Sequence, residues 1–288
     1  MKDFVLMTDS CCDLTAGMAE QLELVVLPLS VLQEGTEYRN YLDHRELDPA
    51  VFYDRLRKGS MGSTSAANVA AFHEAMETVL REGKDILCMS FSSALSTTYQ
   101  SASIAAQELQ EAYPDSRIYV VDTKCASMGQ GLLVYLAGRE KAAGKTIDEV
   151  KAYVEETIPH LCHWFTVDDL NHLKRGGRVS AAAALLGTML QMKPVLHVDD
   201  EGRLIPVSKV RGRKASIKAL LDKMEELAVN TQDVFISHGD CLGEVEEMAR
   251  EIQKRFGTKK VHINYVGPVI GNHSGPGTIA LFFLGKHR

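Results

Sequence analysis

The stretch DILCMSFSSALSTTYQSA, residues 85–102, decides the fold of this chain. Its first part, DILCMSF (85–91), is a short apolar run typical of a buried strand, and residues 97–111 have the pattern of a helix. A strand that leads directly into a helix is the repeating unit of a parallel α/β sheet. Most side chains between Ser90 and Ser101 carry a hydroxyl group, so the junction of strand and helix is the first place to look for a ligand.

The alternation of strands and helices continues on both sides of this stretch. Strands are predicted over residues 4–7, 24–32 and 117–123, and helices over 13–22, 46–58, 69–82 and 127–143. This order predicts a parallel sheet covered by helices, and such sheets bind ligands beyond the carboxyl ends of their strands. The polar segments TDS (8–10), SFSS (90–93) and VDT (121–123) are therefore expected at one edge of the sheet.

The pattern changes after TIDEVKAYVEETIP (146–159), a helix in which Thr146 and Glu149 fit a capping box. Beyond it, strands are predicted over 160–167, 192–210 (two strands and a turn), 233–239, 261–267 and 278–285, with helices within 169–190, 214–228 and 243–256. A hairpin among helices indicates a sheet that is not all parallel. We therefore predict two α/β domains: an N-terminal three-layer domain with a parallel sheet (1–158) and a C-terminal domain with a mixed or antiparallel sheet (159–288).

Composition limits the classes of function. The chain has 288 residues, 45% of them hydrophobic, and a net charge of -6 without a long basic run, so we expect no binding of nucleic acid. No apolar run reaches the length of a membrane span, and the N-terminal segment is too short and too polar for a signal peptide. The six cysteines form no C-x-x-C pair, which favours reduced thiols. We therefore expect a cytoplasmic protein.

Motifs for catalysis and for metal binding are weak. No G-x-S-x-G motif is present for a nucleophilic serine. His160, Cys162 and His163 suggest zinc at first sight, but successive side chains of one strand point to opposite faces and cannot all reach one ion. We therefore predict no catalytic residue, no metal and no cofactor.

Three loops are candidates for an anion site. The start of a helix offers free N–H groups and partial positive charge, to which Ser93 and Ser96 add hydroxyl donors. GSTSAAN (62–68) is predicted to open a helix in the same way, and GNHSGPG (271–277) places His273 where glycines allow close approach. The alternative is that the hydroxyls only cap helices, as serine and threonine do in any protein, and that His273 is structural.

From end to end, the chain resembles the DegV family. The resemblance rests on TDSCCDL, GSTSAAN, SSALSTTYQSA, VVDTKCASMGQG, VDDLNHLKRGGRVS, KPVLHVDDEGRL, KVRGRK and GPVIGNHSGPG, which occur in this order between residues 8 and 277. It implies a two-domain α/β protein that binds a long-chain fatty acid. For many bacteria it further implies the fatty-acid-binding subunit of a fatty acid kinase, whose separate catalytic subunit phosphorylates the bound acid.

The resemblance also implies roles for single residues around the fatty-acid carboxylate. The matching positions are Thr64 and its neighbour Ser65 in GSTSAAN, Ser93 and Ser96 in SSALS, and His273 in HSGPG. Two departures from the family pattern, TSAAN for TSQPS and STTY for SGTY, alter the loops but keep the hydroxyls. A cradle of neutral hydroxyl and amide groups can hold a carboxylate without burying a second full charge.

Most of the affinity must then come from the acyl tail. At about 0.8 kcal/mol per buried CH₂, roughly ten methylenes supply about 8 kcal/mol before the costs of association. Candidate linings of a tunnel are the apolar residues within 183–192 and 279–284, for which ordinary core is the alternative.

We expect a carrier without catalysis of its own, whose partners are a long-chain fatty acid and the catalytic subunit of fatty acid kinase. The basic clusters KRGGR (174–178) and KVRGRK (209–214), with Arg175 and Arg211, are predicted to face that kinase together with His273; solvated surface is the alternative. Peripheral contact with a membrane is expected for lipid exchange. An enzyme acting on a small carboxylate or phosphate, and a lipid sensor without a kinase, remain alternatives.

Overall fold

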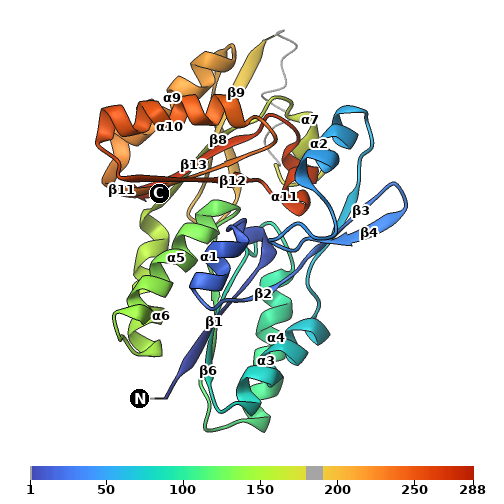
Figure 1. Ribbon diagram of the computed structural model, residues 1–288, viewed down its shortest axis with the longest axis vertical. Helices are drawn as coiled ribbons and strands as arrows, with labels where there is room; N and C mark the ends of the chain where they lie inside the picture. The colour runs from blue at the N-terminus through green and yellow to red at the C-terminus, as the bar shows by residue number, and fades with distance from the viewer. Residues whose placement is uncertain (1, 180–190) are drawn as a thin grey trace.

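The computed structural model describes residues 2–179 and 191–288. Figure 1 shows two bodies, one above the other: most of the first half of the chain forms the lower body and the second half the upper one, while residues 49–57 lie beside the upper body. The predicted boundary at 158/159 falls in η2 (Ile158–His160), a short 3₁₀ helix that separates the last helix of the lower body from the first strand of the upper one. In the described ranges, no helix is both long and apolar enough to cross a membrane.

The lower body contains the predicted parallel sheet. Its strands lie in the order β2-β1-β6-β7, with bounds β1 (Phe4–Asp9), β2 (Val25–Leu27), β6 (Asp85–Ser90) and β7 (Ile118–Asp122). Side chains alternate along the fully buried β6: Ile86 and Cys88 pack on one face, Leu87 and Met89 on the other. Both faces are covered by helices, so the prediction of a three-layer domain is confirmed.

Four long helices form the outer layers of this body. They are α3 (Val69–Arg81) and α4 (Thr98–Ala112) on one face, and α5 (Met128–Ala142) and α6 (Ile147–Thr157) on the other, with η1 (Ser10–Cys12) and α1 (Ala16–Gln21) after the first strand. The predicted capping box is present at the start of α6, where Thr146 and Glu149 bond to each other's backbone N–H. The strand-to-helix order read from 85–111 is therefore confirmed.

The segment 24–32 departs from its prediction as one strand. Pro28 has no N–H to donate to a ladder, and the chain leaves the parallel sheet there. It continues as a separate antiparallel sheet in the order β4-β3-β5, with bounds β3 (Ser30–Gln33), β4 (Thr36–Arg39) and β5 (Ser63–Ser65). The segment 62–68 opens a helix as predicted, because its last residue, Asn68, caps α3, but its hydroxyl residues lie on β5 and take no part in that cap. Helix α2 (Pro49–Arg57) lies between β4 and β5 in the chain and begins after the cap Asp48.

The upper body contains a six-stranded mixed sheet. The strand order is β10-β9-β8-β13-β11-β12, with bounds β8 (Leu161–Thr166), β9 (Met192–Val198), β10 (Leu204–Arg211), β11 (Ala228–His238), β12 (Lys260–Tyr265) and β13 (Ile279–Gly285). Strands β11 and β12 are parallel and the other described neighbours antiparallel, so the predicted mixed sheet is confirmed. Its helices are α7 (Asn171–Arg175), α9 (Arg213–Leu227), α10 (Leu242–Phe256) and α11 (Pro268–Ser274).

The two faces of this sheet have different neighbours. Along β13, Leu281 and Phe283 pack beneath α9 and α10, whereas Ala280 and Phe282 face the opposite way, toward α5 of the lower body. This alternation places one apolar face of the upper sheet against the polar strand ends of the lower body.

Candidate ligand-binding cavity

A cavity of about 490 Å³ lies between the two bodies. Its apolar lining comes from Leu29, Phe91, Leu95, Ala126, Phe165, Leu173, Val198, Leu204, Val266, Val269, Ile270, Ala280 and Phe282. The exposed lining residues Ser65, Ser93, Thr97 and Gln100 mark its mouth. Of the predicted tunnel linings, Ala280 and Phe282 take part, and residues 183–190 lie outside the described residues.

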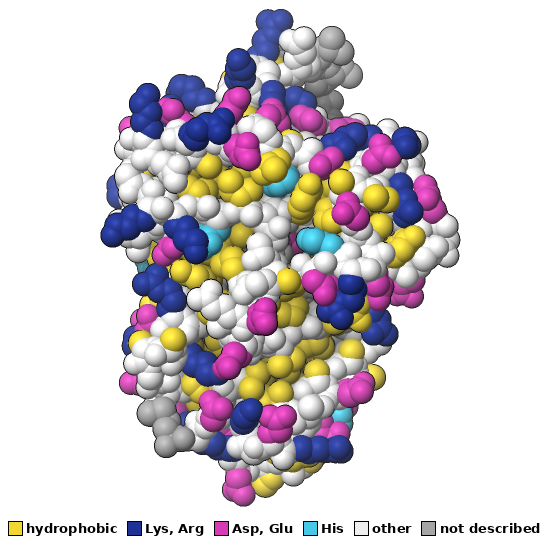
Figure 2. Space-filling view, viewed as in Figure 1, with side chains coloured by type: hydrophobic (Ala, Val, Ile, Leu, Met, Phe, Trp, Pro, Cys, Tyr) yellow, Lys and Arg dark blue, Asp and Glu magenta, His cyan; other side chains and the backbone are white. Residues whose placement is uncertain are grey.

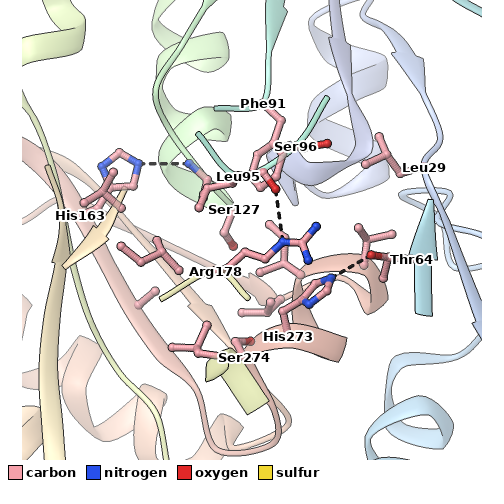
Figure 3. A pocket seen from close by; sticks show the side chains of 18 of the residues that line it. Leu29, Thr64, Phe91, Leu95, Ser96, Ser127, His163, Arg178, His273 and Ser274 are labelled. Atoms are coloured by element: carbon pink, nitrogen blue, oxygen red, sulfur yellow. Dashed lines mark hydrogen bonds between the residues drawn. The ribbon is translucent and has the colours of Figure 1, made fainter. Parts of the chain in front are cut away.

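All five residues predicted to surround a head group line this one cavity. Thr64 and Ser65 come from β5, Ser93 and Ser96 from the loop before α4, and His273 from α11. Figure 3 shows Thr64, Ser96 and His273 at the same end of the cavity, around Arg178. Binding of a carboxylate by these residues stays a prediction.

Thr64 and His273 form a hydrogen-bonded pair across the two bodies. Thr64 Oγ1 lies 2.8 Å from His273 Nε2. Burial, with a smaller contribution from the Arg178 guanidinium, lowers the pKa of His273 from 6.5 to about 4, so the imidazole is neutral near pH 7. Gly176 packs on this ring, because a Cβ there would lie 2.2 Å from His273 Nδ1. Within residues 2–179 and 191–288, Nδ1 has no hydrogen-bond partner.

The serine loop makes bonds of its own. Ser96 Oγ lies 2.8 Å from Thr98 Oγ1 and accepts the Thr98 N–H at 3.2 Å, so it partly serves the start of α4, as the capping alternative holds. Ser93 Oγ lies 2.5 Å from Asp122 Oδ2, at the end of β7. Sequence reasoning placed the VDT segment at this edge but did not identify Asp122 as the partner of Ser93.

Arg178 is the cavity residue that sequence reasoning missed. Its side chain donates through Nε to the Leu95 carbonyl at 3.3 Å, and its guanidinium lies between Ser96 and His273 in Figure 3. The polar end of the cavity therefore has an exposed guanidinium beside the predicted neutral hydroxyls, which the prediction of the cradle did not include. The signal was present in KRGGR (174–178), but that cluster was assigned as a whole to the surface.

The other basic residues lie elsewhere. Arg175 is exposed on α7, with a guanidinium nitrogen 3.6 Å from Met61 Sδ, and Arg211 is exposed at the end of β10. Neither lines the cavity. Arg213 is mostly buried and paired with Glu244 at 3.0 Å, so it is not part of an open basic surface.

His163 closes the end of the cavity opposite Thr64 (Figure 3). Its Nδ1 lies 3.0 Å from the Leu161 carbonyl, and its Nε2 accepts the Ala126 N–H at 3.4 Å. Burial lowers the pKa of His163 well below its usual value, so the ring is neutral. The alternation argued from sequence holds, since His160 and Cys162 turn instead to carbonyls of the C-terminal segment. In the described part of the chain, no three side chains cluster as metal ligands.

A buried polar link joins the two bodies beside the cavity. Ser127 Oγ lies 2.5 Å from Asp13 Oδ2 and 2.8 Å from Ser237 Oγ, while Asp13 Oδ1 accepts the Gly267 N–H at 3.0 Å. Ser127 has a φ of 53°, which is strained for a serine. Burial raises the pKa of Asp13 to about 8.

We expect Asp13→Asn to change how stability depends on pH. Between the ordinary pKa of 3.8 and the folded value of about 8, the folded protein holds the Asp13 proton and the unfolded chain has lost it. Rising pH therefore favours unfolding of the wild type through this group, whereas asparagine does not titrate. The melting temperature of Asp13→Asn relative to wild type should rise steadily from pH 5 to pH 8. The exposed control Asp115→Asn should follow wild type throughout, and a pH-independent difference for Asp13→Asn would contradict the assignment.

Fold and cavity together define a two-domain α/β protein that encloses a mostly apolar cavity with a cationic, hydroxyl-lined end. The family model described as "Uncharacterised protein, DegV family" matches residues 3–286. A DegV domain-containing protein of Clostridium perfringens is 48% identical over 290 residues, which cover 100% of this chain and 99% of that protein. This chain belongs to the DegV family, and the resemblance found in its motifs is confirmed.

Solved structures of relatives have the same fold over their whole length. A DegV family protein from Thermus thermophilus, described for its fatty acid binding, matches with a TM-score of 0.89 and 31% identity, covering 99% of this chain and 100% of that one. DegV of Bacillus subtilis, described as a fatty acid binding protein, matches with a TM-score of 0.86 and 26% identity, with the same coverage.

Proposed function

We propose that this protein binds one long-chain fatty acid in the cavity between its two bodies. The observation that carries the proposal is the division of that cavity: Thr64, Ser96, Arg178 and His273 gather at one end, and the remaining wall is mainly apolar. A carboxylate suits the first part and an acyl chain the second. The fatty acid binding of the Thermus thermophilus and Bacillus subtilis relatives supports the same ligand.

The carboxylate is held by one charge and by hydroxyl donors. The Arg178 guanidinium supplies a charge-assisted hydrogen bond. With the imidazole proton of His273 on Nε2, the ring donates to Thr64 Oγ1 and leaves the Thr64 hydroxyl free to donate to the ligand. His273 therefore acts by orienting Thr64 and adds no second positive charge.

The protein acts as a carrier and performs no catalysis itself. A serine nucleophile needs a base within hydrogen-bond reach, usually a histidine. Among the hydrogen bonds of the described residues, none joins a serine hydroxyl to a histidine ring, and His273 is bonded to a threonine. The relatives described as fatty acid binding proteins support binding over chemistry on the ligand.

Affinity is expected to rise with the length of the fatty acid and then to stop rising. Each added methylene contributes about 0.8 kcal/mol, roughly a fourfold gain in affinity, until the apolar part of the cavity is full. Titration of saturated acids of increasing length, each competing with a fluorescent fatty acid below its micelle concentration, measures this series. Affinity that does not depend on chain length would leave the tail in water and refute the proposal. Extraction of the purified protein followed by mass spectrometry should release a fatty acid.

We further propose that the bound acid is presented to a separate kinase subunit for formation of an acyl phosphate, with lipid exchange at a membrane surface. Arg175 supports this because it is exposed and lies next to Gly176, which packs on His273 at the head-group end. Arg211 is exposed on the same body and is the second candidate for this contact.

Arg175→Ala is expected to leave fatty-acid affinity unchanged and to slow acyl-phosphate formation about tenfold, the usual effect of one interface arginine. The measurement is the initial rate with the cognate kinase at limiting carrier concentration, beside the Kd for the fatty acid. Arg203→Ala, an exposed arginine paired with Asp199 at a turn, is the matched control. If Arg175→Ala and Arg211→Ala both keep the wild-type rate, both clusters are ordinary surface. A protein that binds fatty acid but captures no kinase is a lipid sensor instead.

A further inference from the structure

Asp122 holds Ser93 at the mouth of the cavity. The Ser93 hydroxyl lies 2.5 Å from Asp122 Oδ2, and the Ser93 N–H donates to Oδ1 at 3.1 Å. The same Oδ1 also accepts the N–H of Lys124 at 3.1 Å. Asp122 is half-buried at the end of β7, whereas Ser93 is exposed. One carboxylate therefore fixes both the backbone and the side chain of Ser93.

The direction of the hydroxyl bond follows from the groups involved. A carboxylate only accepts hydrogen bonds, so Ser93 donates its single proton to Asp122. The Ser93 oxygen then turns only lone pairs toward the cavity. A ligand carboxylate also presents only lone pairs, so Ser93 can bind it only after giving up the bond to Asp122.

Asp122 and the ligand carboxylate thus compete for the hydroxyl proton of Ser93 at the mouth of the cavity. Asp122 carries a negative charge next to Ser93, which lines the mouth of the cavity, and like charges repel a ligand carboxylate that approaches Ser93. Arg178 acts in the opposite sense, since its guanidinium attracts a carboxylate. The affinity for the carboxylate head group therefore depends on the difference between the attraction of Arg178 and the repulsion of Asp122.

We propose that Asp122 is a positioning residue that withholds the Ser93 hydroxyl from the ligand carboxylate and so keeps the head group weakly held. The inference rests on the proposed function, because it concerns the same carboxylate. A carrier that surrenders its ligand's carboxylate to another protein gains from affinity that resides in the tail and from a head group that is released easily.

Asp122→Asn is expected to tighten fatty-acid binding about tenfold, the effect of one hydrogen bond to a charged group. The amide oxygen still accepts the two backbone N–H groups, while the amide NH₂ donates to Ser93 Oγ and frees its proton for the ligand. A role confined to structure would predict weaker binding, so a gain in affinity distinguishes the two. Asp200→Asn is the matched control, because Asp200 lines the same surface depression as Asp122 and makes no bond to Ser93. It should change the affinity by no more than about twofold.

A double-mutant cycle isolates the Ser93 hydroxyl. Ser93→Ala should change the wild-type affinity by less than about threefold, yet remove most of the gain when it is added to Asp122→Asn. A loss of about tenfold for Ser93→Ala alone would mean that Ser93 already donates to the ligand, and the proposal would be wrong. The measurement on Ser93→Ala alone tests the proposal even if Asp122→Asn fails to fold, because Ser93 is exposed and its truncation should not disturb the fold.

A fatty alcohol of equal length serves as the uncharged ligand. Its hydroxyl can donate to the Ser93 oxygen, so Asp122→Asn should not improve its binding. Equal gains for acid and alcohol would overturn the proposal. Wild-type protein that binds no fatty acid would overturn the proposed function as well, whereas wild-type binding with unchanged affinity in Asp122→Asn would overturn this inference alone.

Discussion

Ala280→Phe is expected to weaken the binding of long-chain fatty acids about a thousandfold while the protein stays folded. Ala280 lies on β13 with its side chain turned into the cavity and pairs with Phe165 and Ser237 on the neighbouring strands. A phenyl ring there occupies the space of part of the acyl chain. Exclusion of about five methylenes removes about 4 kcal/mol of binding free energy, at about 0.8 kcal/mol each.

The test compares acids of different lengths. Short acids, whose tails do not reach Ala280, should bind Ala280→Phe with nearly wild-type affinity, while long acids lose almost all binding. Ala112→Phe adds the same ring at the exposed end of α4 and should behave as wild type. Melting temperatures of both variants show whether they are folded. A folded Ala280→Phe protein with wild-type affinity for long acids would place the tail elsewhere.

Arg178→Glu is expected to weaken fatty-acid binding about thirtyfold, or about 2 kcal/mol, since an exposed charge is partly screened by water. The substitution replaces an attractive charge at the head-group end by a repulsive one. Arg178→Lys should recover only part of the loss, because an ammonium lacks the forked geometry of a guanidinium.

The ligand and the neighbouring arginine provide the controls for Arg178. A fatty alcohol of equal length carries no charge, so its affinity should be nearly the same for wild type and Arg178→Glu. Arg175→Glu reverses a charge three residues away on the same segment but outside the cavity, and should leave fatty-acid affinity unchanged. Added salt should weaken wild-type binding and have less effect on Arg178→Glu. Equal losses in both arginine variants would indicate a general surface potential.

The sequence predicted those strands, helices and binding loops whose signals lie in a few neighbouring residues. The run at 85–91 is a strand because its apolar residues are continuous and bury both faces, and the hydroxyls that follow mark the edge where ligands bind in parallel sheets. The order of the family motifs further indicated that loops from both halves of the chain form one site. Thr64, Ser96 and His273 do line one cavity.

Features that depend on contacts between distant segments were not predictable in this way. Arg178 is exposed like its basic neighbours, and only the packing of the two bodies decides which of them lines the cavity. The bond of Ser93 to Asp122 joins residues that are 29 positions apart, and hydroxyl-rich composition does not reveal where a proton is donated. Pro28 is a local signal for the break in 24–32, but the prediction of one strand did not use it.

The walls of the cavity come from both bodies, so on the proposed function a bound fatty acid would stabilise their contact. Figure 2 shows hydrophobic side chains on the visible face of both bodies, and the cavity lining likewise combines Phe91 of the lower body with Phe282 of the upper one. A ligand that binds only the folded state adds about 2.7 kcal/mol to the free energy of unfolding when its free concentration is a hundred times Kd. On the proposed function, a cell short of lipid would lose this increment, and a larger fraction of the protein would be open to unfolding and proteolysis.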